Sequence, residues 1–185
     1  MAKPDVLSIS FYFDHSVIVF KNGQIAGIGN NKEGKLGPFF DRLIYNNLSY
    51  SNGFIDTFFI SAVCGENYCL YQLTEDNPEN QSLVVYTYRY KTPLFLNISG
   101  RIPKLLYGGK ETAAIIDTEG AILVVPKSIL SSPKQQIKPT YLPENDRALK
   151  ISFCDEFLLA LGSSGRVFEC SLIVPGCGKF KEVKE

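Results

Sequence analysis

The sequence predicts an all-β protein built from repeated hairpins, and three features support this fold class. Aromatic residues, which favour strands, are abundant, with 13 Phe and 10 Tyr among 185 residues. No stretch shows the sustained 3.6-residue apolar period of an amphipathic helix. A strand–turn–strand pattern recurs four times, about every 50 residues. Such a period is typical of propeller blades or of a β-solenoid.

The four units align where a second strand begins after a short polar turn. The aligned residues are His15, Tyr68, Glu111 and Phe157. In each unit one strand precedes this residue and another follows it. A second turn is expected about eight residues further on, where Gly or Asn suits a positive φ. These turn residues are Gly23, Asn77, Gly120 and Gly165.

A third strand is expected after each of these turns, because the residues that follow are again apolar or aromatic. The expected strands are Ile25 to Ile28, Leu83 to Tyr88, Ile122 to Val125 and Val167 to Cys170. Pro- and Asn-containing stretches between the units are expected to be surface loops. The prediction is one repeat domain over 1–185, with blades at roughly 6–50, 54–97, 98–143 and 144–185.

The most regular stretch is the glycine-rich string over residues 22 to 37, which contains Gly23, Gly29, Gly34 and Gly37. Here the chain resembles the regulator of chromosome condensation repeat family. The string GNNKEGKLG matches that family's Gly-x-Asn-x-x-Gly-x-Leu-Gly pattern, and DHSVIV around His15 matches the preceding segment. Decayed copies of the preceding segment contain Gly65 and Gly109, and the turn positions Gly120 and Gly165 complete the repeat.

This resemblance implies an all-β fold of about four propeller blades, each of short antiparallel strands. The family fold is a seven-bladed ring, so four units would form part of a ring that is incomplete at the C-terminus. The expected function is a non-catalytic protein–protein interaction module, an adaptor or scaffold. The alternative is a guanine-nucleotide exchange factor for a Ran-like small GTPase. A third hypothesis, an enzyme with its site at a propeller axis, lacks any converging set of His, Asp and Glu.

Composition narrows the expected partners. The formal net charge is zero, with 19 basic and 19 acidic residues, so no electrostatic footprint indicates nucleic acid or an anionic membrane. No apolar run is long enough to span a bilayer, and the N-terminus carries no signal-peptide pattern. We therefore expect an intracellular protein, cytoplasmic or nuclear, with a protein partner such as a small GTPase. Open blade faces would also permit self-association.

The cysteines and the single histidine indicate no cofactor. The count of 5 Cys is odd and no pair has C-x-x-C spacing, so neither a zinc site nor a disulfide framework is expected. Cys64 and Cys69 alternate with apolar residues and are interpreted as buried structural thiols rather than nucleophiles. His15 could be a general base or metal ligand. However, its aligned positions include Phe157, which favours a structural role in the blade core.

Three further motifs have functional and structural interpretations. The segment from Gly29 to Lys35 resembles the start of a phosphate-binding loop, but Leu36 replaces the required Ser or Thr, so a blade loop is favoured. The carboxylates of Asp14, Asp117 and Asp155 could be catalytic, but they lie near strand ends, where turns favour Asp. The adjacent aromatics Phe39 and Phe40 either pack on the next blade or form a contact surface, and they are the candidate partner-contact residues.

Overall fold

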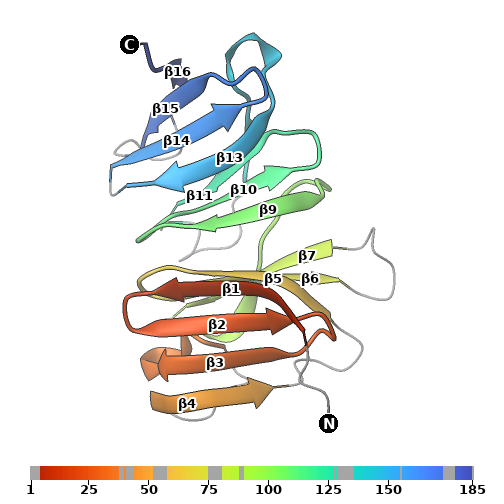
Figure 1. The fold of residues 1–185 in the computed structure, drawn as a ribbon, viewed down its shortest axis with the longest axis vertical. Coiled ribbons are helices and arrows are strands. Elements are labelled where there is room, and N and C mark those ends of the chain that lie inside the picture. Colours follow the sequence, from red (N-terminus) through yellow and green to blue (C-terminus); the bar gives the residue numbers. More distant parts are fainter. Residues whose placement is uncertain are drawn as a thin grey trace. The chain divides into compact units, whose positions relative to one another are not determined.

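The computed structural model describes residues 5–37, 40, 44–51, 58–74, 81–87, 90–126, 128, 136–154, 156–172 and 178–184. These residues form four antiparallel sheets of four strands each, which confirms the all-β prediction (Figure 1). In every sheet the strands follow one another in chain order, so each sheet is a simple meander. No helix in the described residues has the length and apolar character that crossing a bilayer requires.

The strand bounds are as follows. The first sheet contains β1 (Val6–Tyr12), β2 (His15–Phe20), β3 (Ile25–Asn30) and β4 (Ile44–Ser51), and the second contains β5 (Phe58–Cys64), β6 (Tyr68–Thr74), β7 (Gln81–Thr87) and β8 (Tyr90–Phe95). The third contains β9 (Pro103–Gly108), β10 (Ala113–Asp117), β11 (Ile122–Val125) and β12 (Pro139–Thr140). The fourth contains β13 (Ala148–Phe153), β14 (Phe157–Gly162), β15 (Val167–Ser171) and β16 (Lys181–Glu182). Short 3₁₀ helices span Lys32–Gly34 (η1) and Pro143–Asn145 (η2).

The chain divides into two compact units, Met1–Leu96 and Asn97–Glu185, with two sheets in each. Each unit has an apolar core formed by residues from both of its sheets. In the first unit the largest fully buried side chains include Tyr68, Tyr71 and Phe59. In the second unit Phe168 and Ile116 fill the same role. The sheets of a unit are therefore held together by hydrophobic burial.

The turn between the second and third strands depends on glycine, as the repeat predicted. Gly23, Gly120 and Gly165 have φ values of 80°, 83° and 85°, a region that favours residues without a Cβ. Asn77, the expected turn residue of the second unit of the repeat, lies outside the described residues. At two of these turns the glycine carbonyl also accepts a hydrogen bond from the next sheet. Phe59 N donates to Gly23 O at 3.4 Å, and Ala148 N donates to Gly120 O at 2.9 Å.

The register of the hairpins corrects one residue of the repeat alignment. Gly65 N donates to Tyr68 O, and Cys154 N donates to Phe157 O, so Tyr68 and Phe157 close two-residue turns. In the third sheet the matching hydrogen bond runs from Gly109 N to Thr112 O at 2.8 Å. The position aligned with His15 is therefore Thr112 rather than Glu111, because Glu111 lies within the turn.

The cysteines differ in part from the expectation of buried thiols without a disulfide framework. Cys64 and Cys69 are free and buried, as predicted, but the free Cys154 is exposed. Cys170, on β15, is in a disulfide. The sequence did not predict this bond, because an odd count of cysteines without C-x-x-C spacing does not reveal which two of them the fold brings together.

Candidate functional site

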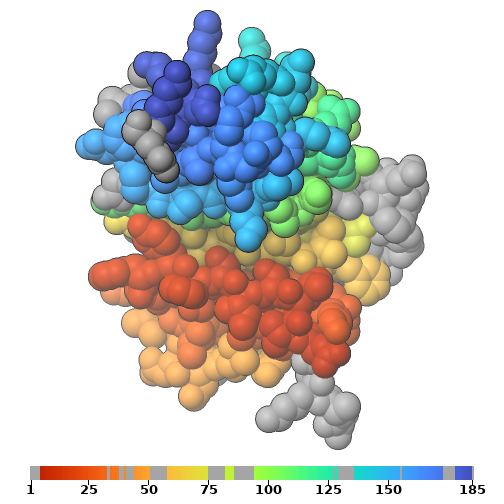
Figure 2. All heavy atoms as spheres, turned by 45° about the horizontal axis from the view of Figure 1, so that its top comes forward, coloured from red at the N-terminus to blue at the C-terminus, as the bar shows by residue number. Residues whose placement is uncertain are grey.

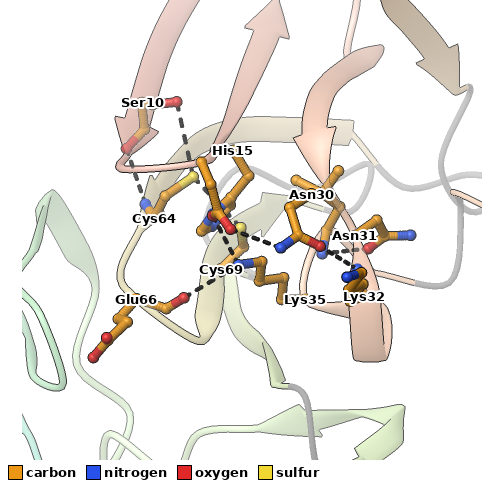
Figure 3. Close-up of polar contacts among 11 residues, drawn as sticks. Ser10, His15, Asn30, Asn31, Lys32, Lys35, Cys64, Glu66 and Cys69 are labelled. Carbon is orange, nitrogen blue, oxygen red and sulfur yellow. Dashed lines mark hydrogen bonds and ion pairs between the residues drawn. The ribbon is translucent and has the colours of Figure 1, made fainter. Parts of the chain in front are cut away.

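A buried polar cluster lies between the first and second sheets of the N-terminal unit. His15 begins β2, Cys64 ends β5, and Cys69 follows on β6 (Figure 3). All three side chains are buried, with 3%, 2% and 0% of their residues' surface exposed. One donor atom from each lies within 4.8 Å of the others.

The cross-strand register brings the two sulfur atoms together. Cys64 and Cys69 are directly opposed on β5 and β6. Because Gly65 and Tyr68 form the hydrogen-bonded pair that closes the turn, the next pair outward is a non-hydrogen-bonded one. Side chains in such a pair approach closely on one face of the sheet. The distance between the two Sγ atoms is 3.4 Å.

Asp14, in the turn between β1 and β2, orients the histidine. Its Oδ1 accepts hydrogen bonds from His15 Nδ1 at 2.9 Å and from Lys35 Nζ at 2.8 Å. Its Oδ2 accepts a third from Asn30 Nδ2 at 2.7 Å. Burial would raise the pKa of Asp14, but these three donors hold it well below its usual range. When His15 is neutral, the ionised carboxylate favours the tautomer with the proton on Nδ1, which leaves a lone pair on Nε2.

The Nε2 atom of His15 is buried and makes no hydrogen bond with the described residues. The thiols are otherwise occupied, since Cys69 Sγ donates to Cys64 Sγ and Cys64 Sγ donates to the Ser10 carbonyl at 3.8 Å. An unpaired buried nitrogen is unfavourable by roughly 1–3 kcal/mol. The cluster therefore combines a ring nitrogen that has no hydrogen-bond partner among the described residues with two adjacent sulfur atoms.

Electrostatics distinguishes the two thiols. The pKa of Cys64 is lowered to about 6, mainly by the hydrogen bond from Cys69. Burial opposes this shift, and His15 adds to it. Complete burial, and then the Cys64 thiolate, raise the pKa of Cys69 well above its usual value. Burial alone would lower the pKa of His15, but Cys64 and Asp14 outweigh it and raise that pKa. Both sulfur atoms are buried and so are not open to a substrate. The arrangement therefore suits coordination of an ion better than nucleophilic catalysis.

The other residues singled out from the sequence have structural roles. Lys35 is 5% exposed and contacts Asp14 and the carbonyl of Glu66, so it does not line a phosphate-binding loop. The Oδ1 atom of Asp117 accepts hydrogen bonds from the backbone N–H groups of Glu119 and Ala121, which is the turn role expected for Asp. Asp155 lies outside the described residues.

The predicted contact surface at Phe39 and Phe40 is wrong for Phe40. This ring is 6% exposed and packs edge-on against Tyr45, with 5.5 Å between ring centroids. The close approach of Gly27, where a Cβ would lie 2.9 Å from the Phe40 ring, makes room for it. Phe39 lies outside the described residues. Phe40 is buried because its ring fills the space over β3 at Gly27, which has no side chain.

Exposed apolar residues gather instead on β1 and the turn that follows it. Ile9, Phe11 and Phe13 are 61%, 78% and 100% exposed, and we name them the β1 surface. Ile9 and Phe11 are two positions apart on the strand and so lie on one face of the sheet. Figure 2 shows the segment that carries them, in red, as a broad exposed area. This surface could not be predicted from the sequence, because strand periodicity does not show which face of a strand is covered.

Solved structures provide the comparison. The human protein WBSCR16 is 12% identical and matches with a TM-score of 0.71 over 96% of this chain and 52% of its own. Prp20p from Saccharomyces cerevisiae is 14% identical and matches with a TM-score of 0.70 over 100% of this chain and 52% of its own. The same protein, described as yeast RCC1, also matches in its structure with Kap60. The chain therefore spans about half the length of these proteins.

The fold is that of RCC1-type propeller blades. Each of the four sheets is one blade, which confirms the predicted fold class. The computationally designed protein Ika4 also matches, with 12% identity, a TM-score of 0.57, and coverage of 92% of this chain and 93% of Ika4. No protein-family model matches the sequence, and no curated protein sequence does. The likeness to these structures is therefore one of fold, carried by blade geometry rather than by retained residues.

Proposed function

We propose that this chain is a non-catalytic protein–protein interaction module whose partner binds the β1 surface. The observation that carries the proposal is the exposure of Ile9 and Phe11 on β1 and of Phe13 in the turn that follows it. Clustered aromatic residues on a surface are typical of protein contact sites, where they bury a large area at low entropic cost. Phe13 is fully exposed at a φ of 42°, a conformation that non-glycine residues rarely adopt.

The likeness to Prp20p supports a binding role, since that protein has reported binding properties toward Gsp1p and histones. Prp20p has also been described bound to Kap60. The balanced charge of the present chain, with 19 basic and 19 acidic residues, supports a protein partner rather than nucleic acid. In this proposal the blades position the contact residues and carry out no chemistry themselves.

A photocrosslinking experiment tests the proposal. A photoreactive phenylalanine analogue replaces Phe11 or Phe13 in cells, and crosslinked proteins are identified by mass spectrometry. Tyr50, 59% exposed on β4, provides a matched aromatic control site on the same sheet. We expect one protein to crosslink from both Phe11 and Phe13 but not from Tyr50. Identical crosslinking from all three positions would refute the β1 surface as a specific contact site.

The second candidate is guanine-nucleotide exchange on a Ran-like small GTPase, and the match to Prp20p favours it. Release of fluorescent GDP from such a GTPase, with and without the purified chain, separates the two proposals. The interaction-module proposal predicts an unchanged release rate. A rate that rises with the concentration of the chain would favour the exchange factor.

A further inference from the structure

We propose that His15, Cys64 and Cys69 bind one zinc ion between the first two blades. The three donors come from three different strands, yet their ligating atoms lie within 4.8 Å of one another. Thiolate sulfur and imidazole nitrogen are the donor types that zinc prefers.

The distance between the two sulfur atoms is close to the one that coordination requires. With Zn–S bonds of about 2.3 Å, a tetrahedral ion holds its two sulfurs about 3.8 Å apart. The observed Sγ–Sγ distance is 3.4 Å. The sulfurs therefore need to separate by only about 0.4 Å. The directly opposed register of Cys64 and Cys69 sets this spacing, because both side chains point to the same face of the hairpin.

The histidine is prepared for this role by its other nitrogen. His15 Nδ1 donates to the Asp14 carboxylate at 2.9 Å, which leaves Nε2 as the ring nitrogen available to a metal ion. A carboxylate that orients a metal-bound imidazole in this way is a common feature of zinc sites. The Nε2 atom is buried and makes no hydrogen bond with the described residues. Zinc would satisfy this nitrogen.

The charges of the cluster also balance with zinc in place. Binding displaces two thiol protons, so two thiolates would offset the charge of Zn²⁺. Asp14 is separately paired with Lys35, whose Nζ lies 2.8 Å from Oδ1. The described residues supply three donors, which leaves one position of a tetrahedral ion for a small exogenous ligand.

Metal content provides the first test. The full chain is purified with reductant, incubated with ZnCl₂, desalted and analysed by elemental mass spectrometry. We expect about one zinc per chain, as a single site of this kind requires. Cys64→Ser should lose the metal, whereas Cys154→Ser, the same exchange at an exposed free thiol, should retain it. Equal zinc content in both variants would overturn the site.

Three further measurements complete the test, and two of them use the wild-type chain, so they remain informative even if the cluster variants fail to fold. Titration of the wild-type chain with Co²⁺ should produce the near-ultraviolet charge-transfer absorption of thiolate coordination, and its absence would overturn the proposal. Asp14→Asn, which removes the orienting carboxylate but no ligand, should weaken zinc binding about 10–100-fold. An unchanged affinity would contradict the orienting role of Asp14. Peptide mapping that finds a Cys64–Cys69 disulfide under the same reducing conditions would also overturn the metal site.

Discussion

The turn glycine of the third blade provides the sharpest test of how neighbouring blades are held together. Gly120 has a φ of 83°, and its carbonyl accepts a hydrogen bond from Ala148 at the start of β13. A Cβ at this position would lie 2.7 Å from the Cβ and 3.1 Å from the Cα of Arg147. Arg147 is itself held, because its Nε donates to Glu119 O at 2.9 Å. Gly120→Ala therefore forces the turn against a fixed segment of the next blade.

The expected loss of stability has two components. A left-handed conformation costs a residue with a Cβ about 1–2 kcal/mol, offset in part by the smaller entropy that alanine loses on folding, about 0.4–1 kcal/mol. Overpacking against Arg147 adds about 1–3 kcal/mol. We therefore expect Gly120→Ala to lower the free energy of unfolding by about 2–4 kcal/mol.

Gly165→Ala is the matched control, because it occupies the equivalent turn of the fourth blade. Its φ is 85°, but no atom lies within 4 Å of the Cβ that alanine would add. This variant should lose only the conformational component, about 1 kcal/mol. Urea denaturation followed by circular dichroism measures both variants. Equal losses would refute the steric argument, since they would show that Arg147 moves aside without cost.

Three further predictions follow from burial and charge. Asp146 accepts hydrogen bonds from two serines of the β14–β15 turn, which lower its pKa to about 2, so its contribution to stability is complete above about pH 4 and is lost as the pH falls toward 2. The stability difference between wild type and Asp146→Asn should therefore shrink between pH 7 and pH 3, and a constant difference would contradict this assignment. The exposed β1 surface should drive concentration-dependent self-association of the isolated chain, and Phe11→Ser should reduce it. Sedimentation would measure this association, and a wild-type chain that stays monomeric at high concentration would contradict the prediction. His15→Phe should cost about 1–3 kcal/mol, since it removes the hydrogen bond to Asp14 from a buried site, while crosslinking from position 13 stays unchanged.

Much of the fold was predictable from the sequence because hairpins are local. The turn positions Gly23, Gly120 and Gly165 were identified correctly, since a positive φ restricts the choice of residue. The third strands were also placed correctly, as β3, β7, β11 and β15 show. The repeat was misaligned by one residue at Glu111, because a polar two-residue turn and the first residue of a strand look alike in a divergent copy.

Contacts between blades were not predictable from local pattern. The aromatic pair at 39–40 reads equally well as core or as surface, and only packing against Tyr45 decided that Phe40 is buried. Phe11 shows the opposite outcome. Its strand, β1, has the alternating pattern of a half-buried strand, yet the face that carries Phe11 is exposed. Periodicity shows that a strand has two faces, and tertiary packing decides which of them is covered.

The sequence by itself determined the fold class, the repeated meander and the glycine turns, because these depend on the conformational preferences of residues close together in the chain. Only the tertiary structure decided that His15 meets Cys64 and Cys69. This contact requires β2 of one blade to lie against the β5–β6 hairpin of the next. No short segment of the sequence contains all three residues, so no spacing along the chain predicts the group. A site assembled across a blade interface depends on side chains from separate strands, so its chemistry appears only when the blades are packed.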